Sequence, residues 1–430
     1  MLTQVSISRK MILIALTFSL PIAVLTYLMV VSIDSNVEFA VKETKGNTVQ
    51  RGLAELLRKV QEHRLARLGC QNGQECEGRL SVLQAEVGQA FQQTQAALDQ
   101  VGAPLQFTTA GLGARGRQHL SLETMRREWS ELTGKLPDAD LAAKHDHLAS
   151  DIRGMITHAG DTSNLILDPD LDSYYLMDVT LLALPQAQER LARVGVLGSA
   201  IIRGGKLTRD DQIQLAVQAS MMQEADLDRI VASTGTSLTE DPNFYGVRAR
   251  LQERIPPALK RYQAAASTFI GMSRRLASAE RPEVTEKEYL QAEDEAHRAS
   301  FEFWSVAVDE LDGLLGARIA SYQDNRNWSL GLASLSVLVA CLLAFFLARS
   351  IVVPLRDVMG SLGPGATLLG VCVERIAEAS KNHFSNPEEA TLICEELDAH
   401  ADGMRQSVLA LALQVEGAQR AESVAVEHNA

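Results

Sequence analysis

Two long uncharged stretches divide the chain. Residues 11–33 (MILIALTFSLPIAVLTYLMVVSI) and 328–348 (WSLGLASLSVLVACLLAFFLA) contain no acidic or basic side chain. At about 1.5 Å per helical residue, each stretch is long enough to cross a hydrocarbon core of about 30 Å. The pattern predicts two transmembrane helices, with a short segment at 1–10, a large segment at 34–327 between the spans and a tail after them.

A cleavable signal peptide is the alternative for the first stretch, because Arg9 and Lys10 precede it. Its apolar run exceeds the ~7–15 residues of a signal-peptide core, and no Ala-x-Ala-like cleavage site follows it. We therefore expect an uncleaved anchor.

Basic residues beside the spans predict their orientation. Arg9 and Lys10 precede the first span, and Arg349 and Arg356 follow the second, whereas Arg326 points weakly the other way. Positive charge is retained on the cytoplasmic side of a membrane. Both termini are expected in the cytoplasm of a bacterial inner-membrane protein, with residues 34–327 in the periplasm.

Between the spans, apolar residues recur at steps of three and four, which is typical of one face of an amphipathic helix. The clearest stripes are Val49, Leu53, Leu56 and Val60; Leu122, Met125, Trp129 and Leu132; Leu141, Leu148, Ile152, Met155 and Ala159; and Phe301, Trp304, Val308, Leu311 and Leu315. The last stripe follows a capping-box pattern from Thr285 to Glu288 and continues into the second span. Turn signals, including those at 204–205 and 233–242, separate eight such segments.

These stripes predict an all-α fold, in which an up-down helical bundle lies between the two spans. One tall bundle and two stacked four-helix modules both satisfy the spacing. We expect two stacked modules, because eight helices in one bundle would need an unusually wide core.

Composition excludes one class of partner. The chain carries 41 Lys and Arg against 54 Asp and Glu, a net charge of −13, and has no long basic run. A broad electrostatic contact with nucleic-acid phosphates is therefore not expected.

The cysteines follow the predicted topology. Cys70 and Cys76 stand in a Gly/Asn/Gln-rich turn of the outer segment, where an oxidising compartment allows a disulfide. Two unpaired surface thiols are the alternative. No further Cys or His pair stands nearby at the spacing of zinc ligands.

Motifs for catalysis are absent from the sequence. Residues 168–173 (DPDLDS) resemble the start of a calcium loop, but the sixth position is Ser173 and the twelfth is Val179, where such a loop has Gly and Glu. Helix capping by Asp170 or Ser173 is the favoured interpretation. We expect no enzyme activity, no cofactor and no metal site.

Four side chains are candidates for ligand contact. His63, Arg64 and Arg67 cluster on the first outer helix, and His145 lies on the fourth. Forked Arg donors in a partly desolvated cleft suit a small anion. The alternative is that their stems cover apolar surface and their charged heads remain in water.

Two segments of the chain have distinctive sequences. Residues 349–355 (RSIVVPL), with Pro354 and Leu355, follow the second of the two spans that bracket the helical outer segment. Residues 161–178 (DTSNLILDPDLDSYYLMD) are expected to form a helix junction that includes Asp168, Pro169, Asp170, Asp172, Tyr174 and Tyr175. These features resemble bacterial methyl-accepting chemotaxis receptors and sensor histidine kinases: residues 349–355 resemble the start of a HAMP linker, and residues 161–178 resemble a signature of helical periplasmic sensor regions.

The resemblance implies a homodimeric sensor whose spans relay a helix displacement into the cytoplasm, and it makes Pro354 and Leu355 part of that relay. The alternative function is a membrane scaffold that docks another envelope protein through its outer bundle. The expected partners are the lipid bilayer, a second copy, a small anionic ligand and a cytoplasmic signalling protein.

The tail departs from the resemblance. A HAMP-like linker is expected at 349–365, where residues 362–366 (LGPGA) interrupt the helical pattern, and a helical cytoplasmic tail follows at 366–430. No receptor hairpin, ATP-binding region or cyclase motif follows the linker. The output module is therefore expected to be absent, and a solvated tail and a surface for a separate signalling protein both remain open.

Overall fold

The structure is a computed structural model that describes residues 7–69, 74–134, 138–383 and 387–416. These residues are mostly helical and contain no β-strand, which confirms the all-α prediction. The α-helices are α1 (Ile7–Gly69), α2 (Gln74–Val101), α3 (Thr109–Ala114), α4 (Leu122–Leu132), α5 (Asp138–Ser163), α6 (Leu171–Met177), α7 (Leu184–Gly204), α8 (Arg209–Met221), α9 (Asp228–Glu240), α10 (Ala249–Ser278), α11 (Glu286–His383) and α12 (Pro387–Glu416).

The chain forms two compact units. Residues 33–324 make one of them, and residues 1–32 with 325–430 make the other. The helices α1 and α11 each contribute residues to both units.

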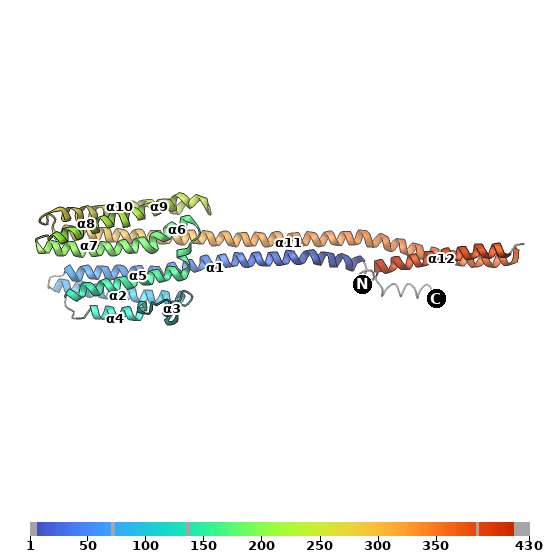
Figure 1. Ribbon diagram of the computed structural model, residues 1–430, viewed down its shortest axis with the longest axis horizontal. Coiled ribbons are helices and arrows are strands. Elements are labelled where there is room, and N and C mark those ends of the chain that lie inside the picture. The colour runs from blue at the N-terminus through green and yellow to red at the C-terminus, as the bar shows by residue number, and fades with distance from the viewer. Residues whose placement is uncertain (1–6, 70–73, 135–137, 384–386, 417–430) are drawn as a thin grey trace. The chain divides into compact units, whose positions relative to one another are not determined.

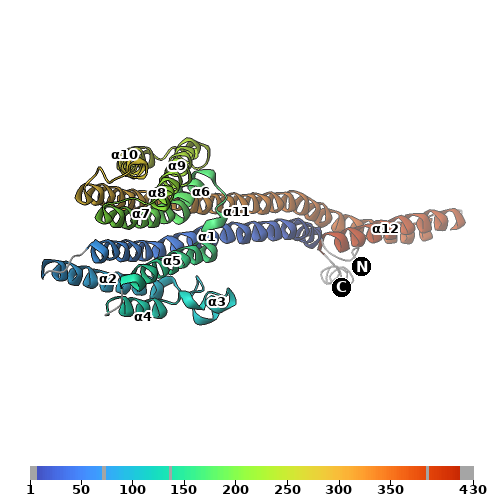
Figure 2. The same ribbon diagram turned by 60° about the vertical axis from the view of Figure 1, so that its left-hand side comes forward.

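Within the unit at 33–324, two groups of antiparallel helices lie side by side. One group contains α1, α2, α4 and α5, and the other contains α7, α8, α10 and α11, as Figures 1 and 2 show. The groups meet along α1 and α11, where Arg51 binds both Asp309 and Asp312. The modules therefore do not stack one above the other as expected. Each of these long helices has an apolar stripe along its length. Packing the two groups side by side buries these stripes more completely than packing them end to end.

The predicted stripes form the core. Val49, Leu53, Leu56 and Val60 of α1 are completely buried, and the stripes of α4, α5 and α11 that begin at Leu122, Leu141 and Phe301 are buried with them. At about 25 cal/mol per Å² of apolar surface removed from water, this burial is the main favourable term in folding.

Helix ends agree with the local sequence at two positions. The hydroxyl of Thr285 accepts a hydrogen bond from the backbone N–H of Glu288, and the Glu288 carboxylate accepts one from the Thr285 N–H. This confirms the capping box before α11. Gly205 caps α7 with a φ of 68°, a left-handed conformation that glycine adopts without a steric penalty.

The turn predicted at 233–242 is mostly helix, because α9 continues to Glu240. Its Ser/Thr-rich sequence suggested a loop. The hydroxyls of Thr234, Thr236 and Thr239 instead bond to the carbonyls four residues earlier, of Ile230, Ala232 and Gly235. Such bonds satisfy the hydroxyl within the helix.

The other unit carries two helical segments that are long and apolar enough to cross a membrane, one near the N-terminus in α1 and one in α11. Their apolar side chains are exposed, as Leu16 and Phe346 illustrate. The interruption predicted at 362–366 is helical in α11. Glycine permits a left-handed helix end but does not require it.

Candidate functional site: a buried charge cluster between three elements

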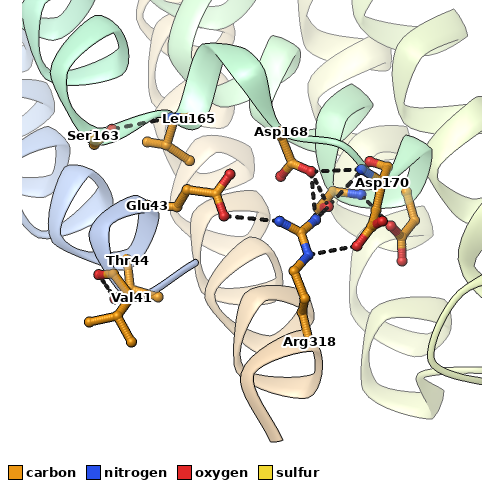
Figure 3. A network of polar contacts seen from close by, with 10 residues as sticks. Val41, Glu43, Thr44, Ser163, Leu165, Asp168, Asp170 and Arg318 are labelled. Carbon is orange, nitrogen blue, oxygen red and sulfur yellow. Dashed lines mark hydrogen bonds and ion pairs between the residues drawn. The ribbon is translucent and has the colours of Figure 1, made fainter. Parts of the chain in front are cut away.

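One arginine lies at the centre of a buried charge cluster. The side chain of Arg318, on α11, is 2% exposed and binds three carboxylates. Its Nε lies 2.6 Å from Asp170 Oδ2, its Nη2 lies 2.5 Å from Asp168 Oδ1, and its Nη1 lies 2.9 Å from Glu43 Oε2 (Figure 3). Charge-assisted bonds of this kind are the strong class of hydrogen bond. We name Arg318, Glu43, Asp168 and Asp170 the Arg318 cluster.

The carboxylates come from two separate elements. Glu43 belongs to α1, whereas Asp168 and Asp170 belong to the connection between α5 and α6. The connection leaves α5 at Asn164, whose φ of 72° turns the chain sharply. Asn tolerates this left-handed conformation better than most residues do. The Arg318 cluster therefore joins α1, α11 and the α5–α6 connection.

The capping interpretation of this connection was wrong for Asp170. Asp170 is the N-cap residue of α6, but its side chain accepts no capping hydrogen bond. Its carboxylate binds Arg318 instead. Asp168 Oδ1 accepts hydrogen bonds from the Asp170 N–H at 3.0 Å and from the Ser173 hydroxyl at 2.9 Å, and so orders the connection.

Burial changes the electrostatics of the cluster. Burial and the neighbouring charge of Asp168 raise the pKa of Glu43 to about 9, although Arg318 acts in the opposite direction. Burial also raises the pKa of Asp168 against the effect of Arg318. Burial lowers the pKa of Arg318, but the neighbouring acidic groups together outweigh burial and raise it, so the guanidinium stays charged. Glu43 is consequently protonated at neutral pH.

The remaining residues of the predicted helix junction differ in their burial. Asp172 is buried and accepts a hydrogen bond from the Ser173 N–H, and burial raises its pKa to about 6. Pro169 and Tyr174 are exposed, while Tyr175 is half-buried and its ring meets that of Tyr174 edge to face.

Sequence reasoning missed Arg318 and Glu43. A signal for Arg318 was present, because it stands three positions after Leu315 and seven after Leu311, within the apolar stripe of α11. A cation in such a stripe needs buried partners. Nothing in the local sequence identifies Glu43 as one of them.

The predicted ligand-contact residues also come together. His63 Nδ1 lies 3.1 Å from His145 Nε2, and His145 Nδ1 lies 2.8 Å from the Leu141 carbonyl oxygen. Since that carbonyl can only accept, His145 donates through Nδ1 and accepts through Nε2. His63 then donates through Nδ1, and its buried Nε2 has no partner among the described residues.

These four predicted ligand-contact residues carry less positive charge than the sequence suggests. Burial lowers the pKa of His63 to about 3 and that of His145 to about 4, so both imidazoles are neutral. Arg64 is already bound by Asp146 at 2.7 Å and by Glu189 at 3.2 Å. Arg67 is half-buried and makes no ion pair with a described residue. The geometry therefore does not favour an anion at His63, Arg64 and His145.

The other predicted positions are the two cysteines of the outer segment and the two residues of the HAMP-like linker. Cys76 is disulfide-bonded, whereas its predicted partner Cys70 lies outside the described residues. Pro354 and Leu355 both lie inside α11, where Pro354 is exposed and Leu355 is half-buried.

Comparisons of this chain with family models, curated proteins and solved structures gave no match. Conclusions about function therefore depend on the sites themselves.

Proposed function

We propose that this chain is a transmembrane sensor of chemoreceptor type. The unit at 33–324 detects a small ligand or the state of the envelope, and α1 and α11 carry a displacement to a cytoplasmic partner. The observation that carries the proposal is the Arg318 cluster, because it joins the two helices that also bear the candidate spans.

The position of the cluster along the chain supports a relay. Arg318 stands ten positions before Trp328, where the second apolar stretch begins, and Glu43 stands ten positions after Ile33, where the first one ends. A shift of α1 against α11 changes the Arg318–Glu43 contact. A shift of the α5–α6 connection changes the contacts with Asp168 and Asp170. Small helix shifts of this kind are an established form of switching transition.

The uninterrupted course of α11 supports transmission. A helix without a loop passes a displacement along its axis, whereas a flexible loop would absorb it. A scaffold protein requires neither a continuous helix nor a buried charge cluster between its membrane-adjacent helices.

The proposed location is the bacterial inner membrane, with both termini in the cytoplasm. The basic residues beside the spans support this orientation. The disulfide at Cys76 also supports it, because disulfides persist in the periplasm and are rare in the cytoplasm. The resemblance of residues 161–178 to periplasmic sensor regions supports a homodimer.

A cysteine cross-link between α1 and α11 tests the proposal. The Asn47 amide donates to the Asp312 carboxylate at 2.7 Å, so the pair Asn47→Cys and Asp312→Cys reports the distance between the helices. Oxidative cross-linking is followed in membranes while amino acids, organic acids and inorganic anions are added in turn. Asn47→Cys alone measures the background from native cysteines.

A sensor has two states that a ligand binds with different affinity, so an effective compound changes the cross-linking rate. Arg318→Met should abolish that response. If the cross-linking rate stays constant with every compound, both with Arg318 and with Arg318→Met in the double-cysteine protein, the scaffold function is favoured.

A further inference from the structure

We propose that Glu128, His147 and Asp151 form a binding site for a divalent transition-metal ion of the zinc class. The site lies between α4, which carries Glu128, and α5, which carries His147 and Asp151. It is independent of the Arg318 cluster and of the proposed sensor function. The sequence predicted no metal site because Glu128 lies on a different helix from the other two residues.

The three side chains offer one ligand atom each, and these atoms all lie within 4.8 Å of one another. His147 and Asp151 are four positions apart, so they share one face of α5. His147 Nδ1 lies 3.2 Å from Glu128 Oε1 and 3.8 Å from Asp151 Oδ2. Packing of α4 on α5 therefore brings three ligands together from two helices.

These separations fit a tetrahedral ion. Zinc binds imidazole nitrogen and carboxylate oxygen at about 2.1 Å, so two ligand atoms of a regular tetrahedron lie about 3.4 Å apart. The two separations at His147 lie on either side of this value. A metal ion therefore fits between the ligand atoms with small side-chain rotations, of which the exposed His147 is the most free to make one.

The burial of Asp151 favours a cation at this position. Asp151 is only 6% exposed, and its Oδ2 is buried without a hydrogen-bond partner among the described residues. An unpaired buried carboxylate oxygen is costly. His147 Nδ1 lies 3.8 Å from Asp151 Oδ2, beyond hydrogen-bonding distance, whereas a metal ion would bind Asp151 as well as His147 and Glu128.

The ligand set selects the kind of ion. One imidazole with two carboxylates suits Zn²⁺ and its neighbours, while Mg²⁺ prefers an octahedron of oxygens and retains its waters. The side chain of His147 is 61% exposed, so water has access to complete the coordination. Such an ion would join α4 to α5.

Zinc titration of the full chain in nanodiscs tests the site. The protein carries no histidine tag, its free thiols are blocked and bound metal is removed with a chelator. Calorimetry with ZnCl₂ is expected to give a site that MgCl₂ does not fill. Asp151→Asn and His147→Ala should each weaken zinc binding at least about 10-fold.

Two matched variants serve as controls. Glu123→Gln removes an exposed carboxylate from α4, and His400→Ala removes an exposed imidazole from α12; both should bind zinc as the wild type does. Thermal unfolding without metal, followed by tryptophan fluorescence, checks that Asp151→Asn is folded. The proposal is wrong if zinc binds no more tightly than magnesium, or if folded Asp151→Asn and His147→Ala retain wild-type affinity.

Discussion

Arg318 Nη1 on α11 lies 2.9 Å from Glu43 Oε2 on α1, and both residues are buried. The same guanidinium binds Asp168 and Asp170 in the α5–α6 connection. One side chain therefore holds three elements together, and removal of its charge would leave its acidic partners buried without a cation.

We predict that Arg318→Met lowers the free energy of unfolding by about 3–5 kcal/mol, the usual cost of breaking a buried ion pair from one side. Unfolding of the full chain in detergent is followed by the fluorescence of Trp129 and Trp304, which are buried in the unit at 33–324. Arg51→Met is the matched control, because Arg51 joins the same two helices through partly exposed ion pairs. It should cost less than about 1 kcal/mol. Equal effects of the two substitutions would contradict a special role for Arg318.

The raised pKa of Glu43 predicts a stability loss at alkaline pH. The folded state holds its proton to about pH 9, while the unfolded chain releases it near pH 4.5. Stability from this group is therefore complete below pH 4.5 and is lost as the pH rises toward 9. Between pH 7 and pH 9, Glu43→Gln should lose about 1 kcal/mol less per pH unit than the wild type. Glu38→Gln, at an exposed position of α1, should keep the wild-type slope.

Three buried histidines predict the opposite dependence at acidic pH. Burial lowers the pKa of His63 and of His297 to about 3, and that of His145 to about 4. The unfolded chain binds these protons near pH 6.5, so stability is present above that value and is lost as the pH falls toward 4.

The histidine effect is best measured in the Glu43→Gln background. Glu43 adds stability as the pH falls, and this substitution removes that opposing contribution. Between pH 7 and pH 5, unfolding should become easier by about 1–2 kcal/mol per histidine. Adding His297→Gln should reduce this loss of stability by the contribution of one histidine, about 1–2 kcal/mol. A stability that does not fall on acidification would show that these imidazoles are not buried as neutral groups.

A close approach of α7 to α11 depends on a glycine. A Cβ at Gly198 would overlap the ring of Tyr289, whereas a Cβ at Gly235 in α9 would meet nothing within 4 Å. Gly198→Ala should therefore destabilise the fold by about 1–3 kcal/mol through overpacking. Gly235→Ala should stabilise it by about 0.5–1 kcal/mol, because alanine favours the helix. The same fluorescence measurement compares the two, and a stabilising Gly198→Ala would contradict the described packing.

The sequence by itself determined the helices and the candidate spans. Apolar residues repeat with the period of a helix, and uncharged stretches of more than twenty residues have a length that matches a bilayer, so both features follow from local spacing. The same reasoning placed the capping box at Thr285 and drew attention to the residues around Asp168.

Only the tertiary structure decided which charges meet. Glu43, Asp168 and Arg318 are separated by more than a hundred positions, and so are His297 and its partner Gln61. Spacing along one helix cannot specify which neighbouring helix faces a given side chain. The lateral arrangement of the two helix groups brought these residues together and paired Arg64 with Glu189. Packing of α4 on α5 within one group placed Glu128 beside His147 and Asp151.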